Sequence, residues 1–269
     1  MTPIFLALAA IAAQAAPAGN GPIETGTARF RSCTALVKQS PDKAIAAADS
    51  WRLQGGGLEA RQCLGLAYAA AERWAPAAAA FEQAAREAET ARQASSADFW
   101  AQSGNAWLAG GQPANALKAF DAALAASSLQ AELRGEVYLD RARAGVALGD
   151  LAGARADMDK GLALVPADPL GWFLSAALAR RQGDLPRART DIAKAVELAP
   201  REARILLEAG NIAGMSGDLA AARSLYARAA QADPQGETGR AAAAALAANG
   251  TGDNAPAPPA ATAPTPQSR

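Results

Sequence analysis

Hydrophobic and polar positions along the chain repeat with a fixed period. Between about 135 and 236, small apolar residues, a polar turn and a proline return at intervals of 34 residues, as from Gly149 to Gly183. The turn always reads Gly-Asp-Leu. The three series are Gly149, Gly183 and Gly217; Ala154, Ala188 and Ala222; and Pro166, Pro200 and Pro234. Coincident series at one period predict a unit of two helices that meet at the glycine and end at the proline.

Simple chemistry explains each position of this unit. Glycine readily takes the left-handed conformation that ends a helix, and the aspartate that follows can cap the next helix. Proline terminates the second helix and directs the chain into the next unit. Small residues let neighbouring helices approach closely, while aromatic residues fill the space between them. Because no pair of helices buries its apolar face alone, the units must stack.

The unit resembles the tetratricopeptide repeat (TPR), which has the same period. In that family, helix A carries an aromatic residue, Leu-Gly and a second aromatic residue, and helix B carries alanine, an aromatic residue and alanine. Residues 97–130 fit this pattern through Trp100, Gly104, Trp107, Gly111, Ala116, Phe120 and Ala123. Further units are expected at 58–91, 135–168, 169–202 and 203–236, with a degenerate first unit at 28–57.

The resemblance implies an all-α fold. We expect a right-handed superhelical solenoid of about six TPR helical hairpins over residues 28–248, in which residues 237–248 form a C-terminal capping helix. The period is interrupted near 92–96 and 131–134. These insertions are expected to lengthen helices or to change the pitch of the superhelix.

The two ends of the chain differ from the repeats. Residues 1–15 hold a short apolar core and a small-x-small site, which predict a secretory signal peptide; the alternative is a short cytosolic helix. The core is too short to cross a bilayer, and no cysteine follows it for lipid attachment. We therefore expect a periplasmic or secreted protein with no membrane insertion after cleavage. Residues 16–27 are interpreted as a linker and residues 249–269 as a disordered Pro/Ala-rich tail.

Composition argues against several kinds of site. The 26 basic residues balance the 26 acidic ones, so no electrostatic reason favours nucleic acid or anionic membrane as a partner. Without histidine there is no imidazole ligand and no Ser-His or Cys-His pair. Asp157 and Asp159 lie two apart on a predicted helix, point differently and are interpreted as a solvated face. We expect no enzyme activity, no cofactor and no metal.

The chain has two cysteines. Cys33 and Cys63 fall in helix A of the first two units, and adjacent A helices run side by side in such a solenoid, which brings the thiols toward bridging range. An oxidising periplasm favours one disulfide between them. The alternative is a pair of separate buried thiols that pack as small apolar groups.

In the TPR family, residues of the A helices line a concave groove. Mapped onto this chain, the expected groove residues are Asn105, Arg143, Phe173, Arg180, Arg181, Arg204 and Asn211. Arginine forks suit carboxylates, and asparagine can hold an extended peptide. The Lys, Asn and Arg set with which some TPR proteins clamp a chaperone tail is absent, apart from Asn105.

The expected function is therefore a non-catalytic scaffold that binds an acidic or C-terminal segment of another exported or envelope protein. In one alternative the arginines only pair with Glu136, Glu208 or Asp184 and keep the surface soluble. In another the chain is a self-associating structural envelope protein whose solenoid ends stack. The sequence leaves the oligomeric state open.

Overall fold

The computed structural model describes residues 26–250, which form thirteen α-helices and no strand. The helices are α1 (Gly26–Gln39), α2 (Pro41–Leu53), α3 (Gly57–Ala70), α4 (Trp74–Thr90), α5 (Ser96–Ala109), α6 (Pro113–Ala125), α7 (Ala131–Leu148), α8 (Leu151–Leu164), α9 (Pro169–Arg181), α10 (Leu185–Leu198), α11 (Ala203–Met215), α12 (Leu219–Ala232) and α13 (Glu237–Gly250). Stacked in hairpins, they confirm the all-α solenoid. The predicted signal peptide, most of the predicted linker and most of the predicted tail lie outside the described residues.

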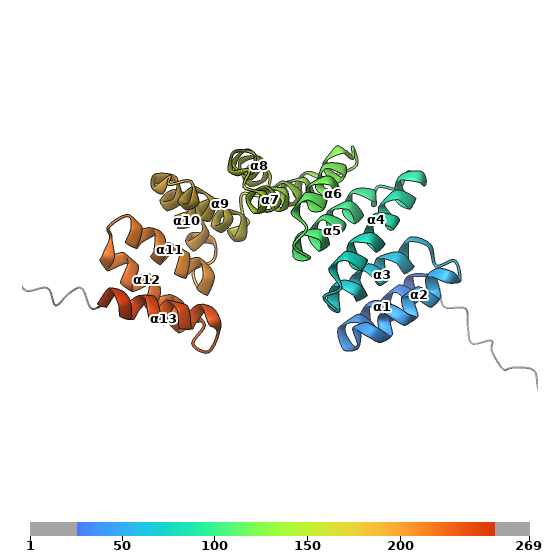
Figure 1. The fold of residues 1–269 in the computed structure, drawn as a ribbon, viewed down its shortest axis with the longest axis horizontal. Coiled ribbons are helices and arrows are strands. Elements are labelled where there is room, and N and C mark those ends of the chain that lie inside the picture. The colour runs from blue at the N-terminus through green and yellow to red at the C-terminus, as the bar shows by residue number, and fades with distance from the viewer. Residues whose placement is uncertain (1–25, 251–269) are drawn as a thin grey trace, which may run out of the picture.

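The hairpins are arranged as an arch. Figure 1 shows the N-terminal helices in one arm, the C-terminal helices in the other, and α7 and α8 near the apex. Helices α5, α7 and α9 lie toward the inner side of the arch, whereas α6 and α8 lie toward its outer side. Three of the expected A helices therefore line the inner surface near the apex.

The three Gly-Asp-Leu turns have the predicted geometry. Gly149, Gly183 and Gly217 have φ angles of 85°, 79° and 83°, in the left-handed region that glycine enters without steric cost. Each following aspartate caps the next helix by accepting a hydrogen bond from the backbone N–H three residues on, at 2.9 to 3.1 Å. The helices α8, α10 and α12 each end two residues before the repeated proline, as predicted.

Glycines and aromatic rings interlock within the hairpins. Phe120 of α6 is fully buried, and its ring lies so close to Gly104 of α5 that a β-carbon at Gly104 would collide with it. Phe81 meets Gly65, and Tyr226 meets Gly210, in the same way. The alanines that flank these rings are also buried: Ala77, Ala84, Ala116, Ala123, Ala222 and Ala229. Close packing of small against large side chains thus holds each hairpin together.

The two interruptions of the period have different outcomes. The insertion at 131–134 begins α7 and makes it the longest helix described, at 18 residues. The insertion at 92–96 instead lies mainly in the connection between α4 and α5. The helix before that connection, α4, has 17 residues, against 14 in each of α8, α10 and α12, so a long helix accompanies both interruptions.

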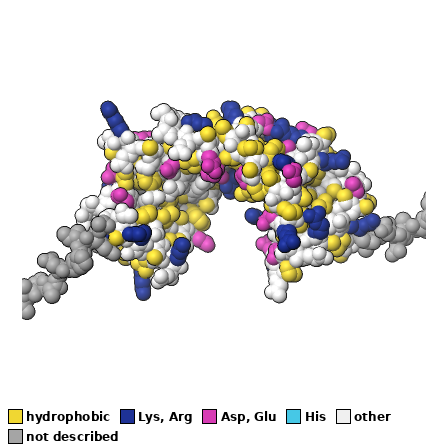
Figure 2. All heavy atoms as spheres, turned by 180° about the vertical axis from the view of Figure 1, so that it is seen from behind, with side chains coloured by type: hydrophobic (Ala, Val, Ile, Leu, Met, Phe, Trp, Pro, Cys, Tyr) yellow, Lys and Arg dark blue, Asp and Glu magenta, His cyan; other side chains and the backbone are white. Residues whose placement is uncertain are grey.

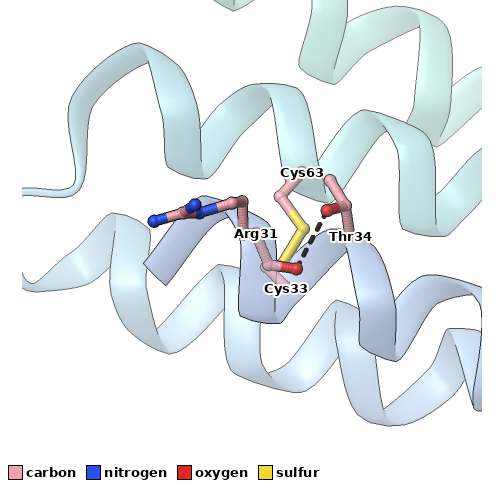
Figure 3. The surroundings of a disulfide bond; sticks show 4 residues. All are labelled: Arg31, Cys33, Thr34 and Cys63. Atoms are coloured by element: carbon pink, nitrogen blue, oxygen red, sulfur yellow. Dashed lines mark hydrogen bonds between the residues drawn. A yellow bond between two sulfur atoms is a disulfide. The ribbon is translucent and has the colours of Figure 1, made fainter. Parts of the chain in front are cut away.

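Both ends of the stack are secured. In Figure 3, Cys33 of α1 and Cys63 of α3 are joined by a disulfide, with 6.3 Å between their Cα atoms. At the other end, Ala242 of α13 is fully buried in a cluster with Leu206 of α11 and Ala229 of α12. None of the helices in residues 26–250 is long and apolar enough to cross a membrane.

Candidate partner-binding surface

The seven predicted groove residues lie on four helices. They are Asn105 on α5; Arg143 on α7; Phe173, Arg180 and Arg181 on α9; and Arg204 and Asn211 on α11. Phe173, Arg180 and Asn211 are half-buried, and the other four are exposed. Three of these helices, α5, α7 and α9, follow the inner side of the arch in Figure 1.

The structure brings three of these residues together. Arg143, Arg180 and Arg181 line a pocket of about 410 Å³ between α7 and α9, which we call the α7–α9 pocket. Its other lining residues are apolar: Val146, Met158, Leu174, Ala177 and Leu178. Met158 and Leu178 are almost completely buried, so they form the floor, while the arginines reach solvent at the rim. The other four predicted groove residues do not line it.

Arg180 is already bound to a carboxylate of this chain. Its Nε donates to Oε1 of Glu208 at 2.6 Å, and the Glu208 side chain is only 9% exposed. The other oxygen of Glu208 accepts from Nδ2 of Asn211 at 3.2 Å, and the Tyr226 hydroxyl donates to Oδ1 of Asn211 at 3.0 Å. Burial and the Glu208 charge raise the pKa of Tyr226. This network ties α9 to α11 and α12, so Arg180 and Asn211 have a structural role.

The remaining arginines are held less firmly. Arg143 pairs with Asp140 at 2.8 Å, and Arg204 pairs with Glu202 at 3.3 Å. Such solvent-exposed pairs contribute only about 0.2–1 kcal/mol, so another carboxylate can compete for the arginine. Within residues 26–250, Arg181 forms no ion pair; its Nη1 donates to the backbone oxygen of Val146 at 3.4 Å. Arg181 is therefore the pocket arginine whose charge is least compensated.

Acidic residues that sequence analysis did not single out as a group lie along α7. Glu132, Glu136 and Asp140 recur at intervals of four and share one face of the helix. Burial, and then repulsion by Glu132, Asp140 and Asp168, raises the pKa of Glu136. Figure 2, which shows the arch from behind, also has acidic and basic side chains interspersed around the hollow. The inner surface is thus not uniformly basic. The regular spacing on α7 was the signal that could have revealed this.

Comparison with known families decides the identity of the fold. A family model described as the tetratricopeptide repeat matches residues 104–169, 139–200 and 173–237. The chain belongs to the tetratricopeptide repeat family. The three matches include all three Gly-Asp-Leu turns. A comparison with curated protein sequences finds no match.

Solved structures of other TPR proteins have the same fold. PilW, described as a widely conserved type IV pilus biogenesis factor, is 21% identical with a TM-score of 0.67, over 80% of this chain and 97% of PilW. PilF of Pseudomonas aeruginosa is 15% identical with a TM-score of 0.65, over 81% and 96% of the two chains. YrrB, described as a TPR protein with an unusual peptide-binding site, is 16% identical with a TM-score of 0.52, over 73% and 96%. At these identities the likeness concerns the fold.

One expectation about the TPR stack is wrong. Asp157 does not lie on a solvated face: it is 8% exposed, and its two oxygens accept from Nε and Nη2 of Arg141 at 2.7 and 2.6 Å. These hydrogen bonds raise the pKa of Arg141. Asp159 is exposed and pairs instead with Arg187 of α10. The spacing of two does separate the carboxylates, but it does not tell which one faces the neighbouring helix. Among residues 26–250 no group of three or more side chains is arranged to hold a metal ion.

Proposed function

We propose that this TPR protein is a non-catalytic scaffold that binds a segment of another exported or envelope protein along the inner side of its arch. The α7–α9 pocket carries the proposal, because there the inner helices offer apolar surface and arginine side chains together. Sites of this kind bind through the apolar lining, and their few polar groups fix the orientation of the ligand.

Three observations support an envelope location. The pattern of residues 1–15 is typical of an export signal. The disulfide between Cys33 and Cys63 belongs to the type of bond that persists in oxidising compartments. PilW, whose fold is similar, is described as a pilus biogenesis factor, which is an envelope role for that protein. We therefore propose that the partner is met outside the cytoplasm.

Site-specific crosslinking in living cells tests this function. A photo-crosslinking amino acid is placed at Asn105, which is exposed on inner helix α5, or at Leu170, which is 45% exposed on inner helix α9. Arg189, exposed on α10, is the control position. We expect one envelope protein to be captured from both inner positions and not from the control, as identified by mass spectrometry.

Charge reversal at the pocket completes the test. The double variant Arg143→Glu/Arg181→Glu should abolish this capture, because repulsion replaces attraction for an acidic segment. The variant Arg189→Glu makes the same kind of charge change away from the pocket and should leave capture intact. Equal capture from the control position, or undiminished capture by the double variant, would contradict the proposed function.

A further inference from the structure

The α7–α9 pocket places anion-binding groups and apolar surface within one small volume. At about 410 Å³ it lies near the lower end of the range of ligand pockets, roughly 300–1,000 Å³. It therefore suits a bulky side chain with the backbone next to it, and it is too small for a folded domain. Because Arg143 and Arg181 line the same small volume as the apolar side chains, an anion bound to them lies beside the group that occupies the apolar floor.

An internal acidic residue of a peptide meets this requirement poorly. In an extended chain, successive side chains point to opposite faces, and residues two apart on the same face are separated by roughly 6.6 Å. An apolar side chain in the pocket would therefore direct a neighbouring Asp or Glu away from it. The last residue of a chain is different, because its carboxylate and its side chain are attached to the same α-carbon.

We propose that the α7–α9 pocket binds the C-terminal residue of the partner protein. A large aliphatic or aromatic side chain packs against Leu174 and Ala177, and the terminal carboxylate binds Arg181 together with Arg143. This inference rests on the proposed function, and it narrows the ligand to a free chain end with an apolar last residue.

The three arginines have different parts in this arrangement. Arg181 has no ion pair among the described residues, and its hydrogen bond to the Val146 oxygen keeps the guanidinium beside the pocket. Arg143 is shared with Asp140 in an exposed pair that a ligand carboxylate can displace. Arg180 is a positioning residue, since its bond to the buried Glu208 fixes the C-terminal turn of α9.

Short synthetic peptides separate these features. The probes are acetyl-Gly-Ser-Leu with a free carboxylate, the same peptide as its C-terminal amide, and acetyl-Gly-Ser-Leu-Asp as its amide, which carries an internal carboxylate beside leucine. Each is titrated into the mature ¹⁵N-labelled protein, and amide chemical shifts are followed by NMR. We expect the free acid to bind in the millimolar range and to shift amides of α7 and α9. Both amidated peptides should bind at least tenfold more weakly.

Variants of the protein complete the test. Arg181→Gln should weaken binding of the free acid roughly tenfold, because it removes the charged hydrogen-bond donor. Ala177→Leu should block the apolar part of the pocket and abolish binding. The control Arg189→Gln changes an exposed arginine of α10 that does not line the pocket, and this variant should bind like the parent protein. Thermal unfolding of each variant confirms that it remains folded.

Several outcomes would overturn the inference. These are equal binding of the acid and its amide, equal binding of the Leu-Asp amide, shifts confined to helices other than α7 and α9, no effect of Arg181→Gln, and absence of any binding. The crosslinking experiment is independent of these probes. If capture depends on Arg143 and Arg181 but the free-acid peptide does not bind, recognition of a terminal carboxylate is refuted. The proposed scaffold function is then unaffected. Failure of both would refute both.

Discussion

Arginines that look alike in the sequence differ in the folded chain by what surrounds them. Arg180 and Arg181 are neighbours on α9, yet Arg180 bonds a carboxylate that is almost fully buried, whereas Arg181 meets only a backbone oxygen of the described residues. Removing one partner of a buried charged pair leaves the other charge without compensation and destabilises the fold. Removing an exposed charge changes the free energy of unfolding little.

We therefore predict that two adjacent substitutions differ in their effect on the free energy of unfolding. Arg180→Gln should lower the free energy of unfolding by about 1–2 kcal/mol, a value reduced for the partial exposure of the arginine. Arg181→Gln should change it by less than about 0.5 kcal/mol. Urea denaturation of the two variants and the parent measures this. Equal stability of the two variants would show that the Glu208 bond contributes little.

A second pair of substitutions tests the contact between glycine and aromatic ring. Gly104→Ala should destabilise the protein by about 1–3 kcal/mol, since the new methyl group overlaps the buried ring of Phe120. Gly214→Ala is the matched control: the nearest neighbouring atom would be 3.8 Å from its β-carbon, and alanine favours a helix. It should be neutral or stabilising by up to about 1 kcal/mol. Thermal denaturation distinguishes these results, and a harmless Gly104→Ala would contradict the packing argument.

At the scale of one helix, the spacing of charged residues in the sequence decides which charges are neighbours on its surface. On α7, Glu132, Glu136 and Asp140 repel one another before the helix reaches Arg143. Because the pKa of Glu136 is raised in the folded chain, the folded state holds this proton more tightly than the unfolded state does. The ionised carboxylate therefore destabilises the fold at neutral pH, and this loss disappears as the pH falls through the raised pKa.

Neutralising Glu136 should follow that pH dependence. Glu136→Gln should raise the free energy of unfolding at pH 7 by up to about 0.5 kcal/mol, the usual size of an exposed like-charge effect on a helix. The gain should vanish near pH 4. Glu59→Gln on α3 is the control, because no carboxylate lies four residues from it. Denaturant titrations at both pH values provide the measurement, and a gain that persists at pH 4 would exclude repulsion as its cause.

At the scale of the whole molecule, each hairpin depends on its neighbours for stability. The first hairpin has a neighbour on one side only among the described helices, and the disulfide between Cys33 and Cys63 attaches it to α3. The two cysteines are 30 residues apart in the sequence. In the chain-entropy model, closing a loop of that length stabilises the folded protein by very roughly 3 kcal/mol.

Loss of the disulfide should therefore act locally. In a Cys33→Ser/Cys63→Ser variant, backbone amides of α1 and α2 should exchange hydrogen much faster, while those of α9 to α12 should keep their protection. Hydrogen exchange followed by mass spectrometry measures both regions in one sample. A uniform loss of protection over all helices would show that the stack unfolds as a single unit.

The sequence predicts some of this architecture because the determinants are local. Gly183, Asp184 and Pro200 fix a turn, a cap and a helix end within a few residues of themselves, so their pattern could be interpreted directly. The sequence offers Glu208 as one of three possible partners for the arginines, but its pairing with Arg180, 28 residues away, depends on how α9 and α11 are rotated against each other. The burial of Asp157 has the same origin. Repeat spacing fixes which residues share a helix face, and the packing of the stack decides which of them remain free for a partner.

Because a disulfide holds one end of the stack and α13 covers the other, fraying from the termini is suppressed. We therefore expect flexing to occur mainly at the junctions between hairpins. Between α8 and the next hairpin, exposed ion pairs such as Asp159 with Arg187 lie beside an apolar cluster that includes Leu162 and Leu178. Flexing there would open or narrow the angle between the two arms. Because salt weakens exposed ion pairs, we expect high ionic strength to loosen this junction.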